Sequence, residues 1–432
     1  MVRGWSVSAV LSVACLTAAA CRPGGDGGAP SGDGGSIQPG LTYHGAIRPL
    51  LEAHCVGCHT DDAVAPFPLD NWEDVRVRSF RVVDAVRSGK MPPAQFDPDC
   101  REVLGQRWMP EEHRQRFLRW ADRGYPEGDP EEYRPPTTDS QPAPTPVGEP
   151  DLVVPMPEPY TPSPSEQGDD FYSVVLEYVF PETTYISASR IVPSEPRVVH
   201  HASVELSDAE GNNLTGEDAS SHEITATVAG YFPGFTDIVL PEGAAFVVPA
   251  GAHLRLGIHY HLGWWSEDDW PADQTEVHFW TLPPDTLPLQ RAHMLALFNR
   301  DLDIAAGDPE SVQSEERHWS GNPMKVIGIG PHMHFWGTEA RLEAIRPDGR
   351  VDCLADVPNY DFDWQVLYHY TDRSGVSLDT DDRMRLTCVY DNSEDNQPTV
   401  SGTQLRTEDR SFGSSSLDEM CNFNLLALEA IE

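Results

Sequence analysis

Histidines recur in the second half of the chain in pairs that could bind a metal. The clusters are His200-His201, His259-x-His261 and His332-x-His334. Successive side chains of a strand point to opposite faces, so each H-x-H pair presents two imidazoles on one face, whereas the adjacent pair should be divided between faces. Imidazole suits zinc, copper, iron or nickel, and an added methionine thioether favours copper. The clusters therefore predict a metal site.

A second motif, CVGCH, spans Cys55, Cys58 and His59. Two thiols at this spacing can attach haem covalently, and the following histidine then binds the iron. A zinc site would need a second pair of ligands nearby, and a thioredoxin-type redox pair would lie in an α/β pattern. The segment reads as helix throughout, and over residues 42–126 it resembles a class I-type cytochrome c domain.

The other axial ligand of the haem should follow later in the same segment. Met91, in SGKMPPAQF, is our first choice, and its thioether would raise the reduction potential relative to a second histidine. Met109 is the principal alternative, and His54 and His113 are weaker ones.

Helical spacing of apolar residues, three and four apart, covers residues 42–126. The stretch 127–150 is rich in proline and acidic residues, as expected of an extended linker. Short β-like runs separated by turn residues then continue to the C-terminus. We therefore expect an all-α cytochrome c domain, followed by two all-β sandwiches at 151–290 and 291–432.

The N-terminus, residues 1–21, has the composition of a secretory signal. Its ending, LTAAAC, resembles a bacterial lipobox, which predicts lipidation of Cys21; ordinary signal cleavage is the alternative. Residues 22–41 are a Gly-rich tether. We expect an exported, periplasm-facing or cell-surface lipoprotein that touches the membrane only through its lipid anchor. The formal net charge of −39 excludes nucleic acid as a favoured partner.

Residues 150–432 resemble the copper type II, ascorbate-dependent monooxygenases. The resemblance rests on VVHHASVEL, GYFPG with LPEGAAFVV, LGIHYHL, PHMHFWG, RLTCVYDNS and SSSLDEMCNFN, which occur in the family's order and spacing. It implies two jelly-roll-like sandwiches, each holding one copper ion across an open cleft. The fold class is thus expected to be multidomain, with an all-α domain before two all-β domains.

The resemblance also implies site residues. One copper would be held by His200, His201 and His259, and a local distortion of the strand would let both adjacent histidines reach it. The copper that activates O2 would be held by His332, His334 and Met420. His261 has no counterpart in the family pattern, and we expect it at the surface or behind the metal ligands, although it could compete with His259.

Cysteines provide two further expectations. Cys388 and Cys421 match a disulfide of the family that fixes the segment of Met420. Cys100 and Cys353 remain, and they either pair with each other or stay as thiols.

The resemblance implies hydroxylation of a C–H bond of a small organic substrate by O2. The fused haem, or an external donor, would supply electrons to the coppers. A haem- and copper-binding redox lipoprotein without hydroxylase activity is the alternative.

Peptide-hydroxylating members of the family carry an arginine that binds the substrate carboxylate and also a tyrosine. This chain has Gly330 and Asn424 at those positions. We therefore expect a neutral or cationic substrate, small or lipid-like, and poor activity on glycine-extended peptides.

Overall fold

A computed structural model describes residues 40–431 except 61–64, 66, 94–95, 107–108, 137–142, 164–168, 215–222, 233–236, 263–269, 284, 320–321, 363, 401–402 and 414. The predicted signal peptide, the lipidation site Cys21 and nearly all of the predicted tether lie outside these residues. No helix of the described part has the length and apolar character needed to cross a bilayer.

The N-terminal described segment forms short helices around a small apolar core. That core includes Ile47, Val75, Phe117 and Trp120, all almost fully buried. Between residues 72 and 87 the helical structure is interrupted at Arg78, so that this stretch forms two helices. The helical elements are a π-helix at Tyr43–Ile47, α1 (Arg48–His54), α2 (Trp72–Val77), α3 (Ser79–Arg87), α4 (Glu111–Asp122) and 3-10 turns at Pro130–Glu132 and Glu394–Asn396.

The predicted fold class, with an all-α cytochrome c domain, is wrong. Strands dominate the described residues, which contain only four α-helices, and residues Gly40–Glu432 cluster as one compact unit. The physical reason lies between α3 and α4, where the chain leaves the helices. Residues 96–106 instead bond to the C-terminal half: Asp97 N–H donates to the carbonyl of Asp356, and Leu104 N–H donates to that of His369. The helices are therefore not a self-contained domain.

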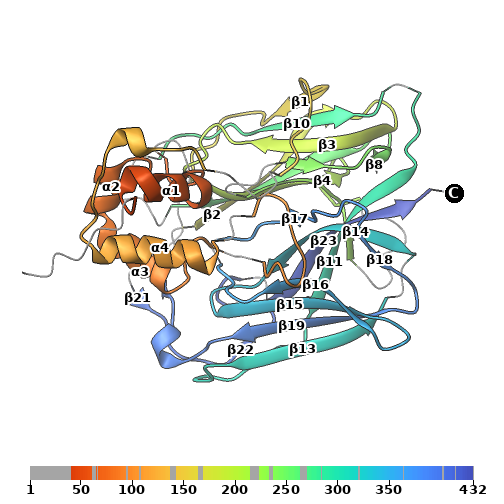
Figure 1. Ribbon diagram of the computed structural model, residues 1–432. Coiled ribbons are helices and arrows are strands. Elements are labelled where there is room, and N and C mark those ends of the chain that lie inside the picture. The colour runs from red at the N-terminus through yellow and green to blue at the C-terminus, as the bar shows by residue number, and fades with distance from the viewer. Residues whose placement is uncertain are drawn as a thin grey trace, which may run out of the picture. The chain divides into compact units, whose positions relative to one another are not determined.

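One long sheet runs through the β region (Figure 1). It has 11 strands and is joined at its middle by β11, which pairs parallel with β8 and antiparallel with β23. Its main path is β1 (Leu152–Pro155), β10 (Glu276–Thr281), β3 (Thr184–Val192), β8 (Ala244–Val248), β11 (Gln290–Asn299), β23 (Cys421–Ala430), β14 (Met324–His332) and β17 (Tyr368–His369), with β5 (Glu223–Thr225), β7 (Asp237–Val239) and β18 (Val376–Leu378) paired beside it.

A four-stranded sheet packs on each half of this long sheet, and each pairing encloses its own apolar core. The N-terminal one consists of β2 (Asp169–Val179), β9 (His253–His261), β4 (Val199–Ser207) and β6 (Thr227–Tyr231). The C-terminal one consists of β13 (Ser311–His318), β19 (Arg383–Tyr390), β15 (Gly337–Ile345) and β16 (Val351–Val357). Two short pairs complete the described strands: β12 (Asp303–Ile304) with β22 (Arg410–Ser411), and β20 (Thr399–Val400) with β21 (Thr403–Gln404).

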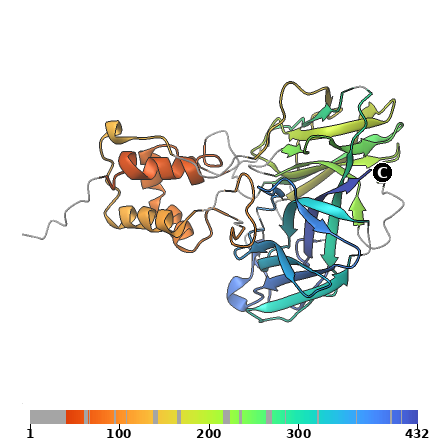
Figure 2. The ribbon, with the colours of Figure 1, turned by 45° about the vertical axis from the view of Figure 1, so that its right-hand side comes forward.

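The central strands bury both faces. On β23, Leu426 belongs to the N-terminal core, whereas its neighbours Leu425 and Ala427 belong to the C-terminal one. A strand covered on both sides carries a continuous apolar run instead of alternation, and residues 425–428 read LLAL. Figure 2 shows β23, in blue beside the C-terminus, passing between the two sets of strands. The two sandwiches therefore share structural elements.

Two disulfides fix segments that are distant in sequence. Cys388 on β19 is joined to Cys421 on β23, and Cys100 is joined to Cys353 on β16. Next to the second disulfide, Arg101 donates from Nε to the carbonyl of Cys353 at 3.1 Å. Cys100 and Cys353, for which the sequence left two states open, are thus paired with each other.

Candidate metal centre

Three histidines from two neighbouring strands converge on one point. Nδ1 of His200 lies 3.3 Å from Nδ1 of His259 and 3.3 Å from Nδ1 of His201. One ring nitrogen from each of the three lies within 4.8 Å of the others, a spacing that allows one ion to be shared. We call this group the first histidine cluster.

A local irregularity of β4 explains how adjacent histidines reach the same point. The pairing of β4 with β9 shifts register between Val199 and His201, and His201 stands directly opposite His259. An extra residue on one strand of an antiparallel pair disturbs the alternation of its side chains. His200 lies at this shift, so its ring turns toward the two paired histidines.

A buried carboxylate supports the cluster from behind. Oδ1 of Asp169, at the start of β2, lies 3.1 Å from Nε2 of His259 and 2.6 Å from Nδ1 of His261. The two histidines hold the pKa of Asp169 far below its usual range against the opposing effect of burial. A carboxylate bonded to one nitrogen of an imidazole fixes the ring and leaves the other nitrogen for a metal. His261 therefore lies behind the cluster, hydrogen-bonded to the carboxylate that also lies close to His259.

His201 is the member of the first histidine cluster whose neutral form is favoured by its surroundings. Burial lowers the pKa of His201 well below the ordinary value, and its neighbours His200, His259 and His332 lower it further. A metal ligand must be the unprotonated imidazole. His201 therefore favours the protonation state that metal binding requires.

The second pair, His332 and His334, lies where β14 ends. Their ring centroids are 5.2 Å apart. Nδ1 of His332 lies 2.6 Å from Oε1 of Gln365, and Nδ1 of His334 lies 3.2 Å from the carbonyl oxygen of Asp418. Both partners are acceptors, so each Nδ1 carries the hydrogen and each Nε2 is left with its lone pair. Burial lowers the pKa of His332 to about 4 and also lowers that of His334.

Glu419 ties this pair to the segment of Met420. Its buried carboxylate accepts hydrogen bonds from the backbone N–H groups of His334 (2.9 Å), Trp336 (2.8 Å) and Met420 (3.0 Å). Burial raises the pKa of Glu419 to about 8, although these N–H groups act in the opposite direction. The hydroxyl of Tyr390 donates to the carbonyl of Met420 at 2.8 Å. The backbone of Met420 is thus fixed beside that of His334.

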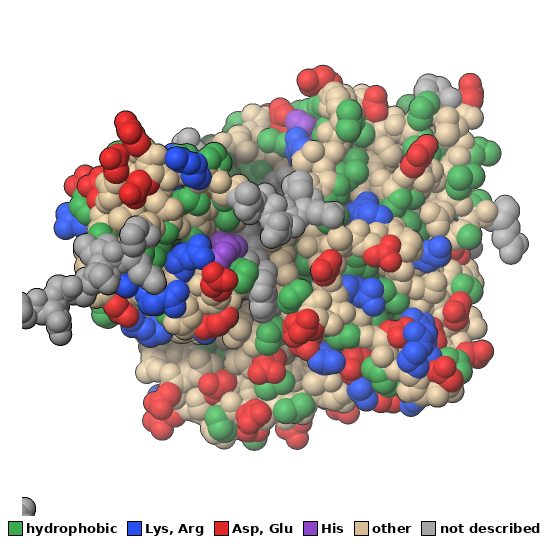
Figure 3. Space-filling model, in the orientation of Figure 1, with side chains coloured by type: hydrophobic (Ala, Val, Ile, Leu, Met, Phe, Trp, Pro, Cys, Tyr) green, Lys and Arg blue, Asp and Glu red, His purple; other side chains and the backbone are tan. Residues whose placement is uncertain are grey.

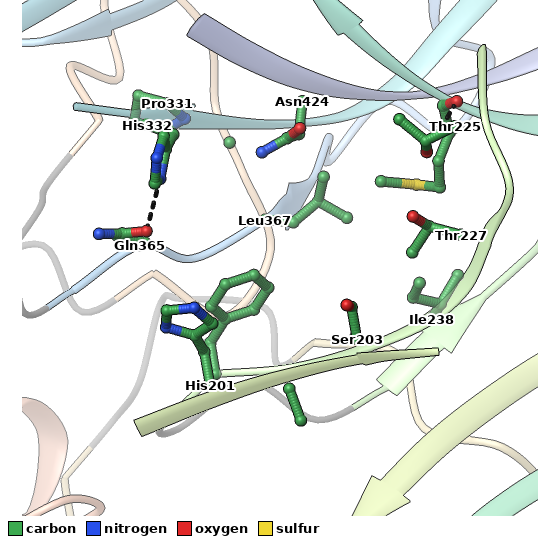
Figure 4. A pocket seen from close by; sticks show the side chains of 15 residues that line it. His201, Ser203, Thr225, Thr227, Ile238, Pro331, His332, Gln365, Leu367 and Asn424 are labelled. Atoms are coloured by element: carbon green, nitrogen blue, oxygen red, sulfur yellow. Dashed lines mark hydrogen bonds between the residues drawn. The ribbon is translucent and has the colours of Figure 1, made fainter. Parts of the chain in front are cut away.

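The two histidine groups face a common space. The ring of Phe362 lies between them, with its centroid 6.3 Å from that of His200 and 6.2 Å from that of His334. Beside it is a cavity of about 200 Å³, and Figure 4 shows His201 and His332 at the same end of it. A molecule in this cavity would be next to both histidine groups.

The CVGCH motif follows α1 directly. Nδ1 of His59 lies 2.9 Å from the carbonyl oxygen of Phe67, so this nitrogen carries the hydrogen and Nε2 is left for an iron. Cys55 and Cys58 take part in neither of the two disulfides. Among the proposed axial ligands, Met91 is partly exposed and Met109 is buried in the helical core. The remaining two, His54 and His113, lie against each other, with ring nitrogens 3.0 Å apart.

Three residues of this region were not predicted from the sequence. Asp169 opens β2, but it is 92 residues from His261 in sequence, and nothing in the sequence indicated that contact. Gln365 and Phe362 lie in a segment between strands whose pattern points to no chemistry. Their roles depend on chain segments that meet only in the folded protein.

Solved structures resemble this chain only weakly. The major capsid protein P2 of bacteriophage PM2 is 9% identical, with a TM-score of 0.30 over 65% of this chain and 98% of the capsid chain. Procruciferin, an 11S globulin from Brassica napus, is 7% identical, with a TM-score of 0.14 over 62% of this chain and 79% of its own. Likenesses at this level carry no argument about function. No curated protein matches the chain.

A family match covers the second histidine pair. It includes His332, His334 and Met420, and the first histidine cluster lies before it in the chain. Residues 314–431, about a quarter of the chain, match the family described as copper type II ascorbate-dependent monooxygenase, C-terminal domain.

Proposed function

We propose that this protein is an exported monooxygenase that holds two copper ions and hydroxylates a C–H bond of a small organic substrate with O2. The observation that carries the proposal is the convergence of His200, His201 and His259. It occurs in a chain whose residues 314–431 match a copper monooxygenase family. Neutral, buried imidazoles are suitable copper ligands.

The first histidine cluster would hold one copper through ring nitrogens that already lie within 4.8 Å of one another. The carboxylate of Asp169 lies 3.1 Å from Nε2 of His259, while Nδ1 of that ring faces His200 at 3.3 Å. This arrangement fixes three ligands before the metal arrives, so little side-chain entropy is lost on binding.

His332, His334 and Met420 would hold the other copper. Gln365 and the carbonyl of Asp418 fix the two rings, and Glu419 holds the backbone of His334 and Met420 together. A mixed imidazole and thioether set favours copper, particularly its reduced state. The bound coppers would supply one electron each and the site at which O2 is activated.

We also propose that Cys55 and Cys58 attach a haem whose iron is bound by His59, with Met91 as the other axial ligand. The contact of His59 Nδ1 with the carbonyl of Phe67 supports this assignment, because it orients the ring as a proximal ligand requires. The haem, or an external donor that reduces it, would supply electrons to the coppers. Export with a lipid on Cys21 would give the oxidising surroundings that haem attachment and two disulfides need.

The test is the metal content of full-length protein made in a bacterial periplasm. Two coppers per chain are expected, with His200→Ala and His334→Ala each lowering the content by one. His318→Ala, at an exposed site on β13, is the matched control and should retain both. Protein that takes up one zinc ion and never two coppers contradicts the proposal. Two coppers without substrate-dependent O2 consumption would favour the redox lipoprotein without hydroxylase activity.

Haem attachment is tested on the same preparation. The haem should remain with the polypeptide in acidic acetone, and Cys55→Ser with Cys58→Ser should abolish this retention. Met91→Ala should remove the thioether-to-iron charge-transfer band. Loss of that band only in Met109→Ala would transfer the axial role to Met109.

A further inference from the structure

The cavity between the two histidine groups defines what kind of molecule could react there. It has a volume of about 200 Å³. In Figure 4 His201 and His332 lie at one end, and Thr225, Thr227 and Ile238 lie at the other. A molecule that fills the cavity would have one end beside the histidines and its remainder among small polar and apolar side chains.

Among the residues that the structure describes, none of those lining the cavity is Asp, Glu, Lys or Arg. Ser203, Thr225 and Thr227 contribute hydroxyl groups, and Asn424 contributes an amide that reaches from β23 toward the middle of the cavity (Figure 4). The apolar part of the lining includes Phe232, Ile238, Met294 and Leu367. A charged group buried without a partner of opposite sign is strongly disfavoured. An uncharged group can instead pair with the hydroxyls and the amide.

The backbone around Gly330 prevents a charged side chain from being supplied there. A Cβ at this position would lie 2.8 Å from the carbonyl oxygen of Val366 and 3.0 Å from Cα of Leu367. Both are backbone atoms, which cannot move aside as the end of a flexible side chain can. Gly330 also pairs across the sheet with Asn424. This wall of the cavity is therefore closed by the segment at Val366 and Leu367.

We propose that the cavity binds a small uncharged molecule, about one aromatic ring with a short chain, that carries a hydroxyl or amide group. This inference rests on the proposed function in taking that molecule as the substrate. An apolar cavity of about 150 Å³ accommodates benzene, so this volume admits a molecule only slightly larger. In the described part of the lining, a cation would find no carboxylate and an anion would find no Lys or Arg.

The experiment compares three probes of similar size: 2-phenylethanol, protonated 2-phenylethylamine and phenylacetate. Binding to the full-length, copper-free protein is measured by calorimetry, so that neither charged probe can bind a metal. 2-Phenylethanol is expected to bind at least tenfold more tightly than either charged probe. Equal or tighter binding of a charged probe would overturn the inference.

Variants show whether the probe occupies this cavity. Ser203→Phe should fill it and weaken binding of 2-phenylethanol at least tenfold, whereas Ser377→Phe, the same change at an exposed position on β18, should not. Thr227→Val is a smaller change that removes a hydroxyl from the lining. It should weaken the binding of 2-phenylethanol but not that of ethylbenzene, which has no hydroxyl group. Unchanged binding in both cavity variants would place the site elsewhere and overturn the inference.

Turnover by the copper-loaded protein separates this inference from the proposed function. Selective binding of 2-phenylethanol without hydroxylation of any probe would support the proposed class of ligand and contradict the proposed monooxygenase activity. Hydroxylation of phenylacetate or 2-phenylethylamine in preference to the alcohol would support the monooxygenase and contradict the class of substrate.

Discussion

Asp169 is the residue through which the first histidine cluster is held in place. Its carboxylate contacts both His259 and His261, so it fixes a ring that the proposed copper would use. Removal of such a supporting partner costs about 10–100-fold in metal affinity. The effect should be confined to one of the two proposed copper sites, because the carboxylate of Asp169 lies against His259 and His261.

Asp169→Asn is therefore expected to lower the affinity for one copper per chain by about 10–100-fold, while the second copper binds as before. A titration of the copper-free protein against a competing chelator measures both affinities. Asp170→Asn is the matched control, since that neighbouring carboxylate accepts from the hydroxyl of Tyr160 and the N–H of Ser163 instead. Equal weakening of both coppers would contradict the assigned role.

His369 lies fully buried on β17, away from the histidine groups in sequence. Burial, reinforced by Arg373, lowers its pKa to about 3. In the unfolded chain the ring takes up a proton below about pH 6.5, while in the folded protein it stays neutral. Because the unfolded state binds more protons, the free energy of unfolding must fall as pH is lowered through this window.

We expect His369 to lower the free energy of unfolding by about 2 kcal/mol when the pH falls from 6.5 to 5. Urea unfolding of the copper-free protein at several pH values measures it. The curve for His369→Gln should be flatter than wild type by this amount, because other buried histidines contribute equally to both proteins and cancel. Parallel curves for the two proteins would show that His369 does not titrate in this way.

At the scale of elements, the sequence predicted strands better than their pairing. Alternation and turn residues located β4, β9 and β14, which carry or border the histidines that the sequence singled out. The distortion expected near His200 is present as the register shift after Val199. Which carboxylate or amide supports each ring depends on pairing between distant segments, such as β2 with β9, which periodicity along the chain does not encode.

Helical spacing was a weaker guide. It marked the right regions of residues 42–126, yet α1 has only 7 residues and α2 only 6. Helices this short depend on tertiary packing. The sequence of residues 96–106 has no pattern that predicts their attachment to the C-terminal sandwich. That attachment rests on a disulfide and backbone hydrogen bonds formed across the fold.

The disulfide between β19 and β23 adjoins Met420. It closes a separation of 33 residues, which corresponds to about 3–4 kcal/mol in the loop-closure model. Cys388→Ser with Cys421→Ser should lower the free energy of unfolding by about that amount, measured by urea unfolding in a Cys100→Ser, Cys353→Ser background. In that background, adding reductant to the protein with the disulfide should reproduce the effect. No difference on reduction would mean that this disulfide contributes nothing.

At the scale of the whole molecule, the shared sheet makes the two sandwiches interdependent. Strands β11, β14 and β23 supply residues to both apolar cores. Separate expression of 151–289 and 290–432 should therefore yield unfolded or aggregated protein, because each piece exposes a face that the other covers. Circular dichroism and NMR dispersion of each piece test this. A dispersed spectrum from either piece alone would contradict the interdependence.

The acidic side chains of this protein are distributed differently from the residues of the proposed site. The net charge is −39, and Figure 3 shows acidic side chains scattered over the visible face instead of gathered in one patch. The described residues of the cavity lining, by contrast, include no acidic side chain. The acidity therefore belongs to the surface and favours solubility without defining the site.

The disulfide between Cys100 and Cys353 has a consequence for any protease that meets this protein. A single cut in the backbone anywhere between these residues leaves both fragments covalently joined. The CVGCH motif precedes Cys100, and so it would stay attached to the β sandwiches after such a cut. The nicked protein would migrate as one chain until a reductant was added, and a haem on the N-terminal fragment would remain in the same molecule as the histidine clusters.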